Sequence, residues 1–109
     1  MTRHIFVGDS DAEAEERGLF GYEGWYEKFA YLWQKNDPRP PASFEEVKRR
    51  NKGALIFGTP ETVRRRIAEE IETTGINYFI ARFAYGNLPL EDSRRSLDLF
   101  IREVMPHFR

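Results

Sequence analysis

The clearest pattern of apolar and polar positions lies between residues 55 and 85. Residues 55–57 form a short apolar run, and Gly58 allows a tight turn after it. From residue 60 to residue 74 the apolar positions fall four apart, which is typical of an amphipathic helix. Residues 76–84 then form a second, mostly apolar run. The segment therefore predicts a strand, a helix and a second strand, which is the βαβ unit of parallel sheets.

The ends of this helix are marked by residues with specific capping roles. Thr59 can cap the first turn with its hydroxyl, and Pro60 fits the first helical position, where no N–H is needed. Gly75 can end the helix in a left-handed conformation. Because residues 76–84 include few polar side chains, we expect a strand that is buried on both faces, as in a parallel sheet covered by helices.

An additional strand and two helices are expected before this unit. Residues 4–7 form a short apolar run, and Ser10 with Glu13 has the spacing of a capping box, so a helix should run from Ser10 to about Arg17. Three glycines, at positions 18, 21 and 24, argue against one continuous helix. A second helix is expected from residue 22 or 25 to residue 35, with an aromatic face that should pack in the core: Trp25, Phe29, Leu32 and Trp33.

The remaining segments comprise a break, a short helix and a final helix. Residues 36–41 are rich in proline and cannot continue a helix. Ser43 and Glu46 form a second capping box that opens a short helix. The final helix is expected to end before Pro106, with one apolar face made of Leu97, Phe100, Ile101 and Val104.

The order of these elements predicts an α/β protein with two or three short parallel strands packed by about five helices. So few parallel strands make a poor independent sheet, since their edges and apolar faces need more covering than the chain contains. Two explanations remain open. Either the chain is the end of a larger α/β barrel, or it associates with other copies of itself.

Composition narrows the possible functions. Lys and Arg number 17 against 18 Asp and Glu, so no net positive field would attract nucleic acid or an anionic membrane. The chain contains no cysteine, which excludes disulfides, thiolate metal sites and cysteine nucleophiles. No apolar run approaches the about 20 residues of a membrane span. We therefore expect a soluble, cytoplasmic protein without nucleic-acid or membrane partners.

Two groups of motifs resemble those of a known family. Near the carboxyl terminus, the sequence Gly58-Thr59-Pro60-Glu61-Thr62-Val63 is followed by Gly75, Gly86 and a helix with Ser96-Leu97-Asp98-Leu99-Phe100, Val104 and Pro106. Near the amino terminus, the strand-to-helix step reads His4-Ile5-Phe6-Val7-Gly8-Asp9-Ser10-Asp11-Ala12-Glu13-Ala14. In this order, the motifs resemble the carboxy-terminal end of the luciferase-like monooxygenases, which are flavin-dependent (β/α)8-barrel enzymes.

The resemblance implies a partial barrel. Residues 1–109 would be a single carboxy-terminal fragment, made of the last two or so βα units with a helical, proline-containing insertion at 18–52. A complete (β/α)8 barrel takes about 250 residues. The full-length family uses FMN or a deazaflavin and acts on a small organic substrate. Since most flavin contacts in the family come from earlier strands, we expect this chain to bind no flavin tightly and to be inactive alone.

Candidate site residues follow from the barrel geometry, which places active-site groups at the carboxyl ends of strands. This rule selects Asp9 and Ser10 after the first strand, and Arg82, Tyr85 and Asn87 at the end of the last one. A cation in an apolar strand, such as Arg82, should pair with an acidic group, a phosphate or a substrate anion, or reach the rim; a structural salt bridge is the favoured interpretation. No motif identifies a catalytic residue.

A metal site is not expected, because His4 and His107 have no other ligand residues at a suitable spacing. His4 is interpreted as a structural residue of the first strand rather than a general base. The aromatic residues between 20 and 33 could roof the substrate side of a flavin site, where exclusion of water protects reactive intermediates. The alternative to the enzyme hypothesis is a non-enzymatic module or truncated paralogue, which would pair with itself or with a separately encoded barrel portion.

Overall fold

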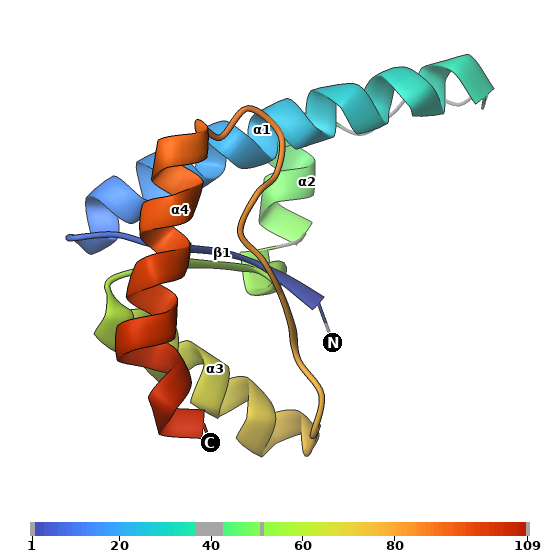
Figure 1. The fold of residues 1–109 in the computed structure, drawn as a ribbon. Coiled ribbons are helices and arrows are strands. Elements are labelled where there is room, and N and C mark those ends of the chain that lie inside the picture. Colours follow the sequence, from blue (N-terminus) through green and yellow to red (C-terminus); the bar gives the residue numbers. More distant parts are fainter. Residues whose placement is uncertain (1, 37–42, 51, 109) are drawn as a thin grey trace.

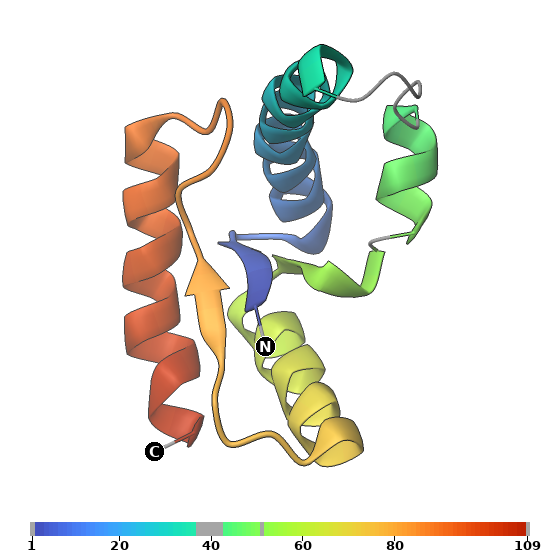
Figure 2. The same cartoon turned by 90° about the vertical axis from the view of Figure 1, so that its right-hand side faces the viewer.

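The structure is a computed structural model that describes residues 2–36, 43–50 and 52–108. It contains a three-stranded parallel sheet with helices on both faces (Figures 1 and 2). The strands are β1 (Thr2–Val7), β2 (Leu55–Gly58) and β3 (Ile80–Arg82). The α-helices are α1 (Asp11–Asn36), α2 (Phe44–Arg50), α3 (Pro60–Thr74) and α4 (Leu90–Leu99), and the short helical turns are η1 (Lys52–Ala54), η2 (Phe100–Val104) and η3 (Met105–Phe108). The predicted α/β class with parallel strands is confirmed.

The strand order is β2-β1-β3, so the first strand lies in the middle of the sheet. Val7 of β1 is opposite Gly58 of β2, and His4 of β1 is opposite Arg82 of β3. The connection from β2 to β3 through α3 must therefore pass across β1. This order was not predicted from the sequence, and it leaves β2 and β3 as the two edges.

The two faces of the sheet have separate cores, because successive residues of a strand point to opposite sides. Ile5 and Val7 of β1 pack with Val63 and Ile67 of α3 and with Val104 of η2. On the other face, Tyr22 and Tyr26 of α1 are buried together with Val47, Leu55 and Tyr85. In both views α1 and α3 lie on opposite sides of the strands (Figures 1 and 2).

The capping residues predicted for α3 are confirmed. The Thr59 hydroxyl accepts a hydrogen bond of 3.3 Å from the Thr62 N–H, and Pro60 occupies the first turn. At the other end, Gly75 has a φ of 68° and its N–H donates to the Ile71 carbonyl at 2.8 Å. The helix therefore begins and ends where its local sequence predicts.

The prediction of two helices between residues 10 and 35 was wrong, because α1 runs without interruption from Asp11 to Asn36. Its glycines face the rest of the fold: a Cβ at Gly18 would lie 2.7 Å from the Phe57 ring, and one at Gly24 would lie 2.3 Å from the Asn87 side chain. The low helix propensity of glycine is offset here by close packing that a side chain would prevent. Residue 18, where the insertion was expected to begin, lies inside this helix.

The predicted core packing of the aromatic face of α1 is only partly correct. Trp25 is half-buried, but Phe29, Leu32 and Trp33 are 44%, 56% and 36% exposed. The second half of α1 extends beyond the sheet (Figure 1) and therefore has little to pack against. The buried aromatic residues of this helix are instead Tyr22 and Tyr26.

The prediction of a long strand buried on both faces was also wrong. β3 comprises only three residues, and it pairs with β1 alone. Phe79, Ala81 and Phe83 pack against the core of the α3 side. The alternate residues point to the other face and are exposed: Tyr78, Ile80 and Arg82. Because α1 lies over β1 and β2, this face of β3 remains uncovered.

The carboxy-terminal helix buries only part of the face that was predicted. Val104 and Phe100 of that face pack in the core of the α3 side, whereas Leu97 and Ile101 are 38% and 45% exposed. Ser96, which was not predicted, is fully buried. The π turn η2 places one extra residue in the helix, which shifts the buried face. The Ser96 hydroxyl accepts a hydrogen bond of 2.8 Å from the Val7 N–H. Val7 has no partner in β3, because the pairing of β1 with β3 ends at His4. The chain also stays helical through Pro106 instead of ending before it.

Two further expectations concern the segment before β2. The second capping box is confirmed, since the Ser43 hydroxyl accepts from the Glu46 N–H at 3.3 Å. The proline-rich break was predicted at residues 36–41; Asn36 is the last residue of α1, and residues 37–41 lie outside the described residues. Within the described ranges, no helix is both long enough and apolar enough to cross a bilayer.

Candidate functional site

The predicted site residues Asp9 and Ser10 lie at the carboxyl end of β1, where both contribute to the fold. Asp9 forms an ion pair with Arg95 of α4. The Ser10 hydroxyl accepts a hydrogen bond of 3.1 Å from the Glu13 N–H and so caps α1. Next to them, a carboxylate oxygen of Asp11 accepts from the Thr59 N–H at 2.9 Å, and this hydrogen bond is the main reason that the pKa of Asp11 is lowered.

The other three predicted residues lie on the α1 side of the sheet. Tyr85 is 8% exposed, and its ring meets that of His4 edge-on, with 4.8 Å between the centroids. The Asn87 side chain occupies the space left by the missing Cβ of Gly24. Arg82 is exposed beside His4, and the favoured structural salt bridge is not found among the described residues.

His4 is the centre of this region. Its ring lies 5.2 Å from that of Tyr22 and 5.5 Å from that of Trp25, in addition to the contact with Tyr85. Sequence reasoning did not find this cluster, because its members come from β1, from α1 and from the segment after β3. The signal that could have indicated it is the histidine that opens the run His4–Val7, whose other residues are apolar.

Two polar atoms of the cluster are buried without a hydrogen-bond partner among the described residues: His4 Nε2 and Tyr85 Oη. Burial lowers the pKa of His4 to about 4, and the nearby Arg82 guanidinium contributes in the same direction. Burial also raises the pKa of Tyr85. At neutral pH the imidazole and the phenol are therefore both uncharged, and each can make a hydrogen bond that the fold leaves unmade.

A row of rings runs outward from this cluster along α1. Trp25 stacks on Phe29 with 5.4 Å between the ring centroids and an angle of 13° between the planes. Phe29 in turn lies 6.0 Å from Trp33. The row connects the buried His4 to the exposed half of α1, and it gives that half of the helix an aromatic surface on which the Phe29 and Trp33 rings are tilted by 46°.

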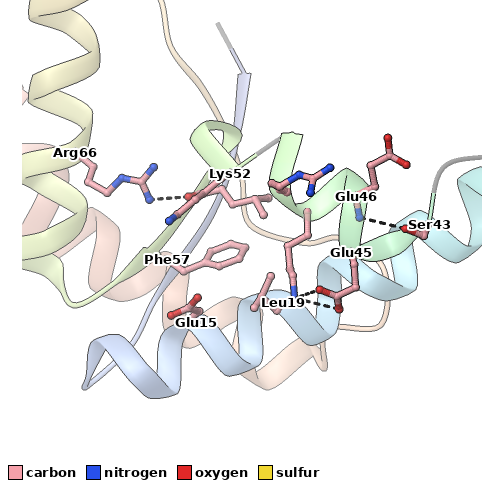
Figure 3. A pocket seen from close by; sticks show the side chains of 11 residues that line it. Glu15, Leu19, Ser43, Glu45, Glu46, Lys52, Phe57 and Arg66 are labelled. Carbon is pink, nitrogen blue, oxygen red and sulfur yellow. Dashed lines mark hydrogen bonds and ion pairs between the residues drawn. The ribbon is translucent and has the colours of Figure 1, made fainter.

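A groove of about 810 Å³ lies beside the edge strand β2, between α1 and α2 (Figure 3). Its apolar floor is made by Leu19, Leu55 and Phe57. The rim is charged, and some of its charged side chains are already engaged. Lys48 Nζ forms an ion pair of 3.1 Å with a Glu45 carboxylate oxygen. An Arg66 N–H donates a hydrogen bond of 2.7 Å to the Leu55 carbonyl. The groove therefore lies along an open edge of the sheet, and its charged residues of both signs do not favour anions over cations.

The described residues do not fit a flavin phosphate at the carboxyl ends of the strands. The Thr59 and Thr62 N–H groups at the start of α3 already donate to Asp11 and to Thr59. Asp9 and Asp11 would place two carboxylates beside an incoming phosphate, and Arg95 is engaged by Asp9. No cluster of three or more potential metal-ligating side chains occurs in the described part of the chain. Among the described residues, the N–H donors at these strand ends are therefore already engaged within the fold.

Comparisons with known proteins agree with a chain that resembles part of a larger protein. No protein-family model matches it. An uncharacterised protein of Sinorhizobium fredii (strain NBRC 101917 / NGR234), y4wF, is 28% identical over an alignment of 97 residues that covers 85% of this chain and 28% of that protein. The crystal structure of the monooxygenase RslO1 from Streptomyces bottropensis is similar with a TM-score of 0.77 and 22% identity, over 100% of this chain and 30% of that one.

These similarities define the class of fold. The chain has an α/β fold similar to that of part of RslO1, and it spans less than a third of the length of either protein that it matches. Because the structural likeness extends over the whole chain, it includes all three strands and α1. At this level of identity the likeness concerns the fold alone.

Proposed function

We propose that this chain is the carboxy-terminal part of a flavin-dependent, luciferase-like monooxygenase and does not catalyse alone. The observation that carries the proposal is the structural similarity of the whole chain to 30% of a monooxygenase. The ordered motifs from Gly58 to Pro106 that resemble the luciferase-like family support the same assignment. In the complete protein, residues mainly outside this chain would hold the cofactor, which would supply oxygen activation if it is FMN or hydride transfer if it is a deazaflavin.

The incomplete sheet supports this proposal. Within the part of the chain that the structure describes, β2 and β3 have no strand on their outer edges, and one face of β3 is uncovered. Parallel sheets are normally buried on both faces, so strands from the remainder of the enzyme would complete this one. The chain would thereby contribute part of the barrel wall.

The residues of this chain would contribute by forming part of the wall of the substrate-binding side of the flavin site and by excluding water from it. The rings of Trp25, Phe29 and Trp33 form an apolar surface next to the His4 cluster. An apolar cover excludes water from reactive intermediates of oxygenation. No proton-transfer or redox step is assigned to a residue of this chain.

Flavin retention tests this proposal. We expect the 109-residue chain to leave FMN fluorescence unchanged at micromolar concentrations, because its donors at the strand ends are already engaged. A longer polypeptide that includes the preceding βα units should copurify with flavin. A defined one-to-one FMN site of micromolar affinity on the 109-residue chain would contradict the proposal that the cofactor is held elsewhere.

A second candidate function, a self-associating module without a cofactor, is favoured by the exposed apolar side chains. Along the carboxy-terminal helix, Leu90, Leu97, Ile101 and Met105 are 71%, 38%, 45% and 39% exposed. Such residues mark association surfaces when they are contiguous. In light scattering of the isolated chain we expect a dimer or a larger oligomer. A monomer across the accessible concentration range would rule this candidate out.

A further inference from the structure

Helix α4 and the turn η2 that continues it form an outer side of the molecule. In Figure 1 α4 crosses the front of the fold, and in Figure 2 it lies along the left side, with no described element beyond it. Ser96 and Val104 face inward, to the Val7 N–H of β1 and to the core of the α3 side. The rest of the helix surface is open to solvent.

Apolar side chains on this open surface follow one line along the helix. Leu90, Leu97 and Ile101 occupy the i, i+7 and i+11 positions, which lie on one side of a helix, and all three are exposed. Arg94 lies on the same line, between Leu90 and Leu97. Such a line, several turns long, is the kind of surface that two helices bury when they pack side by side.

The charged residues along this line alternate in sign. In chain order they are acidic, basic, acidic and basic, and none has an ion-pair partner among the described residues: Glu91, Arg94, Asp98 and Arg102. Their charged neighbours Asp92 and Arg95 are already paired, with Arg17 and Asp9. When the alternating order is reversed it becomes basic, acidic, basic and acidic. An antiparallel copy of the helix would therefore present the opposite charge at each position.

This charge pattern selects one register for the antiparallel pair. With the two-fold axis beside Ser96, Glu91 lies opposite Arg102 of the second copy, and Arg94 lies opposite Asp98 of the second copy. An axis half a turn further along, beside Asp98, would place that carboxylate against itself and Arg94 against Arg102. Like charges at these positions would oppose association.

The apolar residues match in the same register. Leu97 lies next to the axis, so it meets Leu97 of the second copy. Leu90 and Ile101 lie on either side of the axis at nearly equal distances, so Leu90 of one copy meets Ile101 of the other. Charge and apolar contact therefore agree on one arrangement of two identical chains.

We propose that the outer side of α4 and η2 binds a second copy of this chain, with the two helices antiparallel about a two-fold axis beside Ser96. The interface is isologous, because both copies use the same surface. The proposal deepens the second candidate function given above, since it names the partner, the surface and the register, and it rests on the self-association considered there. It does not depend on the flavin assignment.

Glu91 and Arg102 provide the sharpest test, because they lie about 16 Å apart along one helix and cannot pair within a chain. Glu91→Lys and Arg102→Glu each create two like-charge pairs in the dimer, one on each side of the axis. We expect each variant to dimerise about tenfold more weakly in sedimentation equilibrium at low ionic strength, where exposed charges are least screened.

A mixture of these two variants separates the interface from any effect on folding. In a dimer of one Glu91→Lys chain with one Arg102→Glu chain, both charge pairs across the interface have opposite signs again. The equimolar mixture should therefore recover about the affinity of the parent chain. Glu72→Lys is the matched control, because it makes the same change of charge at an exposed position of α3 and should leave dimerisation unchanged.

The apolar part of the interface is tested at Leu90. Its side chain is 71% exposed, so Leu90→Gln should leave the helical signal in circular dichroism unchanged. Dimerisation should weaken about tenfold, because two contacts with Ile101 are lost, one on each side of the axis. Tyr78→Gln is the control on the uncovered face of β3, where the side chain is 65% exposed, and it should have no effect on dimerisation.

Three results would overturn the interface. They are a monomer at all accessible concentrations, a mixture of the two charge variants that associates no better than either variant alone, and a loss of dimerisation in Tyr78→Gln that Leu90→Gln does not show. If one of these occurred while a longer polypeptide still retained flavin, the interface alone would be wrong and the proposed function would stand.

Discussion

Replacement of Gly86 by alanine is expected to lower the free energy of unfolding by about 2–5 kcal/mol, as the sum of backbone strain and a steric clash. Gly86 has a φ of 57°, in the left-handed region that side chains disfavour. A Cβ at this position would also lie 1.9 Å from the Gly21 carbonyl oxygen. Because that contact joins the segment after β3 to α1, the alanine must push these two parts of the fold away from each other.

Three other glycines separate the two contributions. Gly75 has a φ of 68° with no atom near its missing Cβ, so Gly75→Ala should cost only the strain, about 1–2 kcal/mol. Gly24→Ala should cost only the clash with Asn87, and Gly53→Ala should cost almost nothing, since no atom lies within 4 Å. Urea unfolding of the four variants measures these values. A loss at Gly86 no larger than that at Gly75 would show that α1 does not pack on this segment.

Acidification from pH 6.5 towards pH 4 is expected to destabilise the protein through His4. Burial, assisted by Arg82, lowers the pKa of His4 from 6.5 to about 4 in the folded state. Over this interval the unfolded chain binds a proton at His4 that the folded chain does not, so the free energy of unfolding falls as the pH falls. The contribution of the neutral His4 to the free energy of unfolding is fully present above pH 6.5. Below that pH it decreases by at most about 1.4 kcal/mol for each unit by which the pH falls.

The second histidine provides the control for this prediction. His4→Phe retains a ring among Tyr22, Trp25 and Tyr85 but cannot be protonated, so its stability should be nearly constant between pH 6.5 and pH 5. His107→Gln changes an exposed residue whose Nε2 lies 2.8 Å from Arg64 Nη1. The stability of this variant should depend on pH in the same way as that of the parent protein. Stability curves of the same slope in the His4→Phe variant and the parent would contradict a buried, neutral His4.

The elements whose ends depend on local chemistry were predictable from the sequence. Thr59, Pro60 and Gly75 set the bounds of α3 through their own hydrogen bonds and backbone preferences, with little influence from the rest of the chain. The βαβ unit and the parallel sheet followed from these bounds. The strand order did not follow, because nothing local in β1 indicates that it lies between β2 and β3.

The errors arose where distant contacts outweigh local preferences. The glycines of α1 reduce its intrinsic helicity, but Gly18 and Gly24 allow contacts with Phe57 and Asn87 that hold the helix in place. Residues 76–84 are apolar enough for a long buried strand, yet β3 has only one neighbouring strand and lies outside the cover of α1. Both outcomes depend on what surrounds the segment and not on its own sequence.

The members of the candidate site that follow a strand were selected from the sequence, whereas the contacts between them depend on distant parts of the chain and were not. Arg82, Tyr85 and Asn87 were selected by their place after a strand, and the structure brings all three to the side of α1. His4, which lies at the centre of these residues, was interpreted as a structural residue. Its ring contacts were not foreseen, because most of them come from a helix whose position the sequence does not define. Asp9 and Ser10, selected by the same rule, instead meet α4 and the start of α1.

We propose that βα units encoded ahead of this chain complete the fold, and the coding sequence immediately upstream tests this most directly. We expect the DNA before the first codon to encode further alternating strands and helices, in frame or after a frameshift, towards the about 250 residues of a complete barrel. Stop codons in every frame, with no such units encoded upstream, would contradict the claim and leave the self-associating module as the function to pursue.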